Sequence, residues 1–95
     1  MKPRTAAWST PSDPITDAIR DVLDEVATAK ELWPPFNSAH EGYGVLDEEF
    51  EELKKHVFMK QKNRDLDAMR KEAIQVAAMA VRFASELCTE ERGRK

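Results

Sequence analysis

Hydrophobic residues recur at intervals of three and four along three segments of the chain, which is the spacing of one face of an α-helix. The first stripe comprises Ile15, Ile19, Val22, Val26, Ala29 and Trp33. Asp13 precedes it as an N-cap, and Pro14 fits the first helical position. The sequence WPPF at 33–36 ends this helix, because a residue before proline is pushed out of the α region.

The second stripe predicts a helix from about residue 39 to about residue 59. Its members are Leu46, Phe50, Leu53 and Val57. Ser38 followed by Glu41 fits a capping box at its start. Gly42 and Gly44 each cost about 1 kcal/mol relative to alanine inside a helix. They indicate either the close approach of a ligand or another helix, or a frayed first turn.

The third segment is hydrophobic on nearly every side. After a polar turn at 60–65, the sequence EAIQVAAMAVRFASEL predicts a helix to about residue 88. A helix that is apolar all round belongs at the centre of a bundle, but a three-helix monomer of this size offers too little to cover it. Its small residues, which would let a partner helix approach closely, are Ala73, Ala77, Ala78, Ala80 and Ala84. We therefore expect an all-α fold in which a three-helix protomer forms a dimeric or tetrameric helical bundle.

These elements divide the chain into three parts. Residues 1–12 are polar, contain Pro3 and Pro11 and lack periodicity, so they are interpreted as a flexible N-terminal arm. The helical domain spans 13–88. A charged C-terminal tail follows at 89–95.

The composition of the 95 residues narrows the class of protein. The formal net charge of -3 argues against a general nucleic-acid binder, which would be basic. No apolar run reaches the ~18 residues needed to span a membrane, and the N-terminus lacks the apolar segment of a signal peptide. A single cysteine, Cys88, allows neither an internal disulfide nor a zinc cluster. We expect a cytoplasmic protein in a reducing setting, without nucleic-acid or membrane partners, in which Cys88 is a small buried hydrophobe.

The stretch VLDEEFEELKKHV at 45–57 concentrates negative charge on the second predicted helix. Five carboxylates fall in six positions: Asp47, Glu48, Glu49, Glu51 and Glu52. Like charges three or four residues apart repel by roughly 0.2–0.5 kcal/mol per pair. Glu51 can pair with Lys55 one turn later, so it is explained as part of a solvated surface. Glu49 and Glu52 instead lie beside the apolar stripe, where two carboxylates need a cation or a basic partner.

The third predicted helix carries a matching polar stripe. Its members are Glu72, Gln75, Arg82 and Glu86. If the two helices pack antiparallel, the first two of these face Glu49 and Glu52 across the groove. Three carboxylates and one amide oxygen are ligands suited to Mg²⁺ or Mn²⁺. The alternative is ordinary ion pairing of the acids with Arg70, Lys71 or Arg82.

Two short motifs follow one another in this region. The first is EExxEL, formed by Glu48, Glu49, Glu52 and Leu53, and the second is KEAIQVAAMA at 71–80. Their order resembles the MazG-like, all-α nucleoside triphosphate pyrophosphatases, which carry an ExxE pair on one helix and an ExxD pair on the next. The resemblance covers residues 36–87. It implies Mg²⁺-dependent cleavage of a nucleoside or deoxynucleoside triphosphate to the monophosphate and pyrophosphate, by dimers or larger assemblies built on four-helix bundles.

The resemblance also implies roles for individual residues. Glu49 and Glu52 match the first pair of metal ligands, and Glu72 matches the first acid of the second pair. Gln75 stands where the family has aspartate, and a neutral amide can coordinate a cation but supplies less charge. Glu48 or Glu52 would orient the attacking water. The residues that would contact the nucleotide are Lys54, Lys55, Arg70, Lys71 and Arg82 for the phosphates, and His40 and Tyr43 for the base or ribose.

Several of these side chains also have ordinary structural explanations. His40 is consistent with a surface histidine at a helix start, and Tyr43 with a half-buried core tyrosine. His56 is interpreted as a surface neighbour of Glu52. The aromatic residues of the loop, Trp33 and Phe36, are interpreted as packing residues rather than a base-stacking pair.

Two other functions stay open. One is a binding or regulatory module that keeps the fold but has lost turnover, for which Gln75 is the evidence. The other is a purely structural helical dimerisation domain, against which the narrow polar stripe of the third helix argues.

Overall fold

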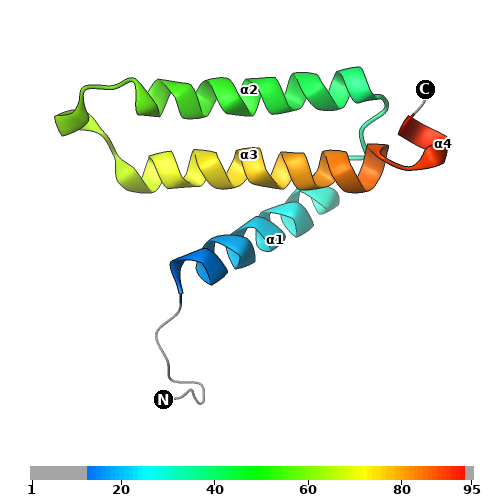
Figure 1. Cartoon of the computed structure of the whole chain (residues 1–95), viewed down its shortest axis with the longest axis horizontal. Helices are drawn as coiled ribbons and strands as arrows, with labels where there is room; N and C mark the ends of the chain where they lie inside the picture. The colour runs from blue at the N-terminus through cyan, green and yellow to red at the C-terminus, as the bar shows by residue number, and fades with distance from the viewer. Residues whose placement is uncertain (1–12, 94–95) are drawn as a thin grey trace, which may run out of the picture.

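The computed structural model describes residues 13–93, and within that range the regular structure is entirely helical. Its helices are α1 (Pro14–Leu32), α2 (Ala39–Val57), α3 (Leu66–Leu87) and α4 (Glu90–Gly93), with a 3₁₀ turn η1 (Gln61–Asn63) between α2 and α3 (Figure 1). The all-α prediction is therefore confirmed, and the short α4 is added to the three predicted helices. The predicted arm at 1–12 lies outside the described residues, as do residues 94–95 of the tail.

Helices α1 and α2 begin at the caps that the sequence predicts, and α3 begins after a side-chain cap of the same kind. The side chain of Asp13 accepts a hydrogen bond from the Ile15 backbone N–H at 3.3 Å. Ser38 Oγ accepts one from the Glu41 N–H at 3.1 Å, and Asp65 caps α3 in the same way. These bonds satisfy N–H groups that have no partner within the helix.

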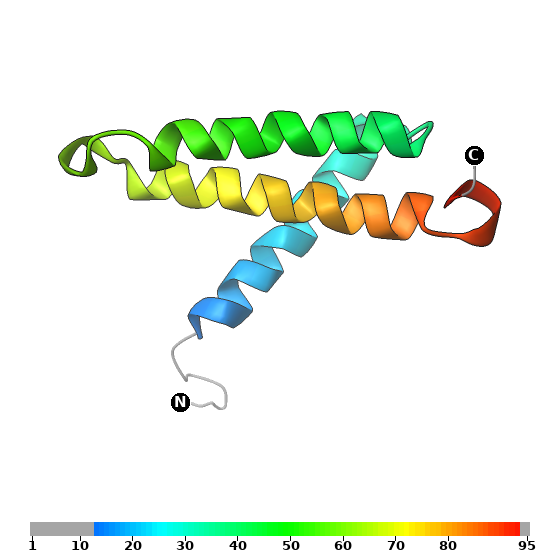
Figure 2. The same ribbon diagram turned by 45° about the horizontal axis from the view of Figure 1, so that its top comes forward.

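Helices α2 and α3 form an antiparallel hairpin, and α1 packs obliquely across α3 (Figures 1 and 2). The C-terminal half of α1 lies against the hairpin, whereas its N-terminal half projects away from it. The buried hydrophobic core is small and comprises Ala29, Phe36, Ala78, Met79 and Leu87. Val22, Val26, Val45, Leu46 and Phe83 pack around it.

The two glycines of α2 differ in their surroundings. A Cβ added to Gly42 would lie 2.7 Å from Leu87 Cδ1 and 2.8 Å from Phe83 Cδ2. The glycine therefore lets α3 approach α2 closely, and a frayed first turn is not the explanation. Gly44 has open space around it.

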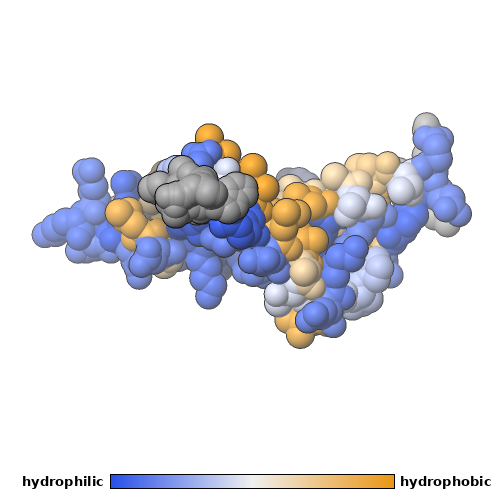
Figure 3. Space-filling model, turned by 90° about the horizontal axis from the view of Figure 1, so that it is seen from below, coloured by the Kyte–Doolittle hydropathy of each residue, from blue (hydrophilic) through white to orange (hydrophobic). Residues whose placement is uncertain are grey.

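Much hydrophobic surface is exposed to solvent. The exposed large hydrophobic side chains are Ile15, Ile19, Leu23, Leu32, Trp33, Tyr43, Phe50, Phe58, Met59, Leu66 and Val81. Seen from the side on which α1 lies, hydrophobic atoms reach the surface between the charged side chains (Figure 3). None of the helices in the described part of the chain is long and apolar enough to cross a membrane.

Three predictions about single side chains are wrong. Tyr43, expected to be a half-buried core tyrosine, is 66% exposed. Cys88 is exposed, at the C-cap position just after α3 ends at Leu87. Trp33 is 63% exposed, whereas Phe36, the other aromatic of the loop, is buried as expected.

Candidate functional site

The antiparallel hairpin brings the acids of α2 and α3 together. Glu49 is half-buried between the helices. Burial raises the pKa of its carboxyl group above the ordinary value, and the negative charges of four neighbouring glutamates raise it further. In order of decreasing effect these neighbours are Glu72, Glu52, Glu48 and Glu25. Glu49 is therefore the centre of a cluster of like charges, which we call the acidic cluster.

Helix α1 contributes to this cluster through Glu25, which the sequence analysis missed. Glu25 directly precedes Val26, a member of the hydrophobic stripe of α1. The criterion that singled out Glu49, a carboxylate at the edge of an apolar stripe, applies equally to Glu25. The cluster thus draws on three helices rather than two.

The other acid of the first pair, Glu52, points toward solvent. Its carboxylate accepts a hydrogen bond from Lys55 Nζ at 2.9 Å, and both side chains are at least half exposed. This hydrogen bond and the negative charge of Glu52 raise the pKa of Lys55 above its ordinary value. Within residues 13–93, no three carboxylate, imidazole or thiol groups converge on a point where they could hold one metal ion.

A cavity of about 480 Å³ opens beside the acidic cluster, enclosed by α1, the loop after it, α2 and α3. Its apolar lining is Ala29, Leu32, Trp33, Pro34, Phe36, Val45 and Met79. Its polar lining is Glu25, Asn37, Glu41, Glu48, Glu49, Gln75 and Arg82. The exposure of Trp33 follows from its place in the wall of this cavity, where its indole remains open to solvent.

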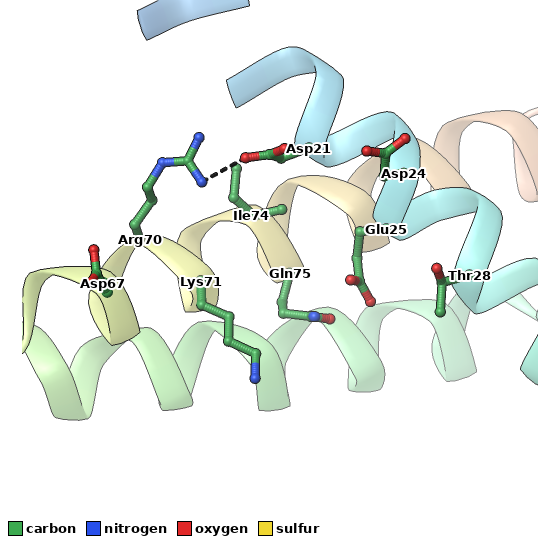
Figure 4. Close-up of a pocket in the computed structure, with 9 residues that line it drawn as sticks. All are labelled: Asp21, Asp24, Glu25, Thr28, Asp67, Arg70, Lys71, Ile74 and Gln75. Carbon is green, nitrogen blue, oxygen red and sulfur yellow. Dashed lines mark ion pairs between the residues drawn. The ribbon is translucent and has the colours of Figure 1, made fainter. Parts of the chain in front are cut away.

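A second, smaller cavity of about 300 Å³ lies between α1 and α3 (Figure 4). Glu25 and Gln75 line both cavities, and in the close-up their side chains extend into the same space. Lys71 extends along the same side of α3. On the far side of this cavity, Arg70 Nη1 lies 2.7 Å from Asp21 Oδ2.

The basic residues predicted to hold phosphate occupy different surroundings. Lys71 and Arg70 line the smaller cavity, but Arg70 is already paired with Asp21. Lys54 lies with its Nζ 5.9 Å from the centre of the Phe58 ring, and Lys55 pairs with Glu52. Of the two basic residues that line the smaller cavity, Lys71 is therefore the one that makes no ion pair within the described residues.

Arg82 is buried and engaged by protein groups. Its Nε donates to Glu86 Oε2 at 2.8 Å and its Nη2 donates to the Pro34 carbonyl at 3.0 Å. Its guanidinium stacks 4.4 Å from the centre of the Phe36 ring. Glu86 in turn accepts a hydrogen bond from the Phe36 N–H at 2.9 Å. Arg82 thus fixes the loop after α1 at the edge of the larger cavity.

The remaining candidates lie apart from the cluster or beside it. His40 and Tyr43 are exposed on α2, and neither lines either of the two cavities. His56 is half-buried, and its Nδ1 is enclosed without a hydrogen-bond partner. The structure therefore brings Glu49, Glu72, Gln75 and Glu48 into one region and leaves His40 and Tyr43 outside it.

Comparisons with known proteins do not assign the chain. No protein-family model, curated protein or solved structure matches it. The resemblance to the MazG-like family rests on the motifs of the sequence, and it stays a prediction.

Proposed function

We propose that this protein is a metal-dependent nucleoside triphosphate pyrophosphohydrolase that cleaves an NTP or dNTP to the monophosphate and pyrophosphate. The observation that carries the proposal is the acidic cluster around Glu49, next to a cavity of about 480 Å³. Repulsion that raises the pKa of Glu49 in the absence of a cation is the electrostatic condition that a bound divalent cation relieves.

The donor groups fit Mg²⁺ or Mn²⁺. Both ions prefer oxygen ligands, and Mg²⁺ is commonly held by one or two carboxylates, several waters and the phosphates of the substrate. Convergence of three protein carboxylates on one point is therefore not required. Glu49 and Glu72 would hold the ion, with Gln75 and Glu52 at the edge of the site. When bound, the ion would neutralise phosphate oxygens and acidify a coordinated water.

The other side chains of the region suit the remaining tasks. Glu48 is exposed at the rim of the cavity and would orient water toward the α-phosphorus and accept its proton. Lys71 would hold the β- and γ-phosphates from α3. The apolar wall of the larger cavity, with the exposed indole of Trp33, offers a surface on which a base can stack.

The proposal is tested by measuring pyrophosphate release from the common NTPs and dNTPs with Mg²⁺ or Mn²⁺. Glu49→Gln and Glu72→Gln should abolish it, whereas Glu51→Gln, on an exposed part of α2, should not. Gln75→Asp restores the acid of the family pattern and should tighten metal binding and raise turnover. Equal activity in all four variants would refute the site assignment.

A binding module without turnover is the second candidate, favoured by the neutral Gln75 and by the ion pair that occupies Glu52. In that case metal and nucleotide bind, but no pyrophosphate is released by the wild type or by Gln75→Asp. For either function we propose a dimer or tetramer as the working assembly.

A further inference from the structure

The flank of α2 that faces away from α1 exposes aromatic side chains. Tyr43 is 66% exposed and Phe50 is 59% exposed. The two residues are seven apart and so lie on the same side of the helix. Val45, Glu48 and Glu49 lie on the opposite flank, where they line the larger cavity with α1. Helix α2 therefore has one face for the candidate site and a second, hydrophobic face that is uncovered.

The hairpin is strongly polarised along its length. Its closed end, residues 54–71, carries seven lysines and arginines against two aspartates. Its open half, residues 37–53 and 72–93, carries ten acidic and two basic residues. Two such hairpins attract when they lie antiparallel and repel when they lie parallel, because antiparallel packing puts each basic end beside an acidic one.

Two charges border the exposed face in positions that match this arrangement. Asp47 and Lys54 are seven residues apart, on the same side of α2 as Phe50. Neither makes an ion pair with another described residue, and Lys54 Nζ lies 5.9 Å from the centre of the Phe58 ring. In an antiparallel pair of α2 helices that cross at Phe50, Asp47 opposes Lys54 of the partner subunit. Two-fold symmetry forms this ion pair twice.

We propose that two copies of this chain pack antiparallel through the Tyr43–Phe50 face of α2, with reciprocal Asp47–Lys54 ion pairs. A 19-residue helix is about 28 Å long, and two helices side by side are about 20 Å wide. That face amounts to about 500 Å² per copy, so a pair buries about 1,000 Å², the lower bound for a specific interface. The exposed alanines of α3 extend the same face, where Ala73 and Ala80 let a second helix approach.

The inference rests on the proposed assembly and not on catalysis. If the protein dimerises but releases no pyrophosphate, the proposed interface stands and the proposed activity fails. If it is an active monomer, the proposed interface fails and the proposed activity stands. Light scattering across a concentration series should show a dimer of the full chain. A monomer at tens of micromolar would refute the proposal.

Charge exchange tests the register. Asp47→Lys and Lys54→Asp should each weaken dimerisation by about tenfold or more, because each places like charges opposite one another twice. The double variant, with both changes, should restore the wild-type dissociation constant. Asp47 and Lys54 are both exposed, so the circular dichroism of these variants should match that of the wild type. The matched control is Glu31→Lys, the same kind of change on an exposed side chain of α1, and it should leave dimerisation unaffected.

A covalent probe tests the two-fold axis. In a Cys88→Ser background, Phe50→Cys should form an intermolecular disulfide under mild oxidation, whereas Glu31→Cys, on an exposed position of α1, should not. A dimer in which neither charge variant weakens association, or in which Phe50→Cys fails to cross-link, would show that another face is used and would overturn the proposal.

Discussion

Arg82 and Glu86 form an ion pair one helical turn apart on α3, with Arg82 Nε 2.8 Å from Glu86 Oε2 and with side chains only 3% and 8% exposed. The pair links α3 to the loop after α1 through the Pro34 carbonyl and the Phe36 N–H. Arg92 of α4 adds hydrogen bonds to the Glu86 and Phe36 carbonyls. This network sets where the loop, and with it Trp33, stands beside the candidate site.

Removing Arg82 should destabilise the fold severely. Arg82→Met leaves Glu86 buried without its cation, and breaking a buried pair from one side costs about 3–5 kcal/mol. Urea denaturation should show this loss in the free energy of unfolding. The double variant Arg82→Met, Glu86→Leu should lose less than Arg82→Met alone, because it leaves no uncompensated charge. A loss under about 1 kcal/mol for Arg82→Met would mean that the pair contributes no more to stability than a solvent-exposed ion pair does.

Glu86 and Glu49 should affect the pH dependence of stability in opposite directions. Burial acts to raise the pKa of Glu86, but the hydrogen bonds from Arg82 and the Phe36 N–H and the charges of Arg82 and Lys30 lower it below the ordinary value of 4.5. A lowered pKa in the folded state stabilises above the unfolded pKa, and this contribution is lost as the pH falls through the folded value. Glu86→Gln should therefore flatten the fall in stability between about pH 5 and about pH 3.

The pKa of Glu49 is shifted in the opposite direction to that of Glu86. Its pKa is raised in the folded state, so ionised Glu49 destabilises the fold at neutral pH, and the strain is relieved as the pH falls toward the ordinary value. Glu49→Gln should raise the melting temperature at pH 7 without metal by about 2–4 °C. Glu51→Gln, outside the cluster, is the control and should change it less.

Divalent metal should reverse the order of the melting temperatures, so that the wild type becomes more stable than Glu49→Gln. A ligand that binds only the folded state at a hundred times its Kd stabilises by about 2.7 kcal/mol. Mn²⁺ should therefore raise the melting temperature of the wild type and of Glu51→Gln, but not of Glu49→Gln or Glu72→Gln. An equal response from every variant would mean that the carboxylates form a solvated surface without a specific site.

The two glycines of α2 provide a matched pair of substitutions. Gly42→Ala places a methyl group 2.7 Å from Cδ1 of Leu87, a fully buried side chain, and should cost about 1–3 kcal/mol. Gly44→Ala adds the same group in open space and should stabilise α2 by about 0.5–1 kcal/mol. Thermal unfolding of both variants gives the comparison, and destabilisation by both would contradict the close packing at Gly42.

The sequence by itself determined the helices and much of the acidic cluster. Asp13, Ser38 and Asp65 cap their helices through bonds to residues two or three positions away, so the information is local. The facing of Glu49 and Glu72 followed from helical periodicity once α2 and α3 were taken as antiparallel. A short turn between two amphipathic helices leaves few other arrangements.

Only the tertiary structure decided where α1 crosses α3, and several side chains depend on that crossing. It covers Ala29 but leaves Ile15 and Ile19 of the same stripe exposed. It also brings Glu25 to the acidic cluster and opens a cavity beside Trp33. Periodicity defines which face of a helix is apolar, but the length of that face that becomes buried depends on the crossing angle, which is set by packing between distant residues.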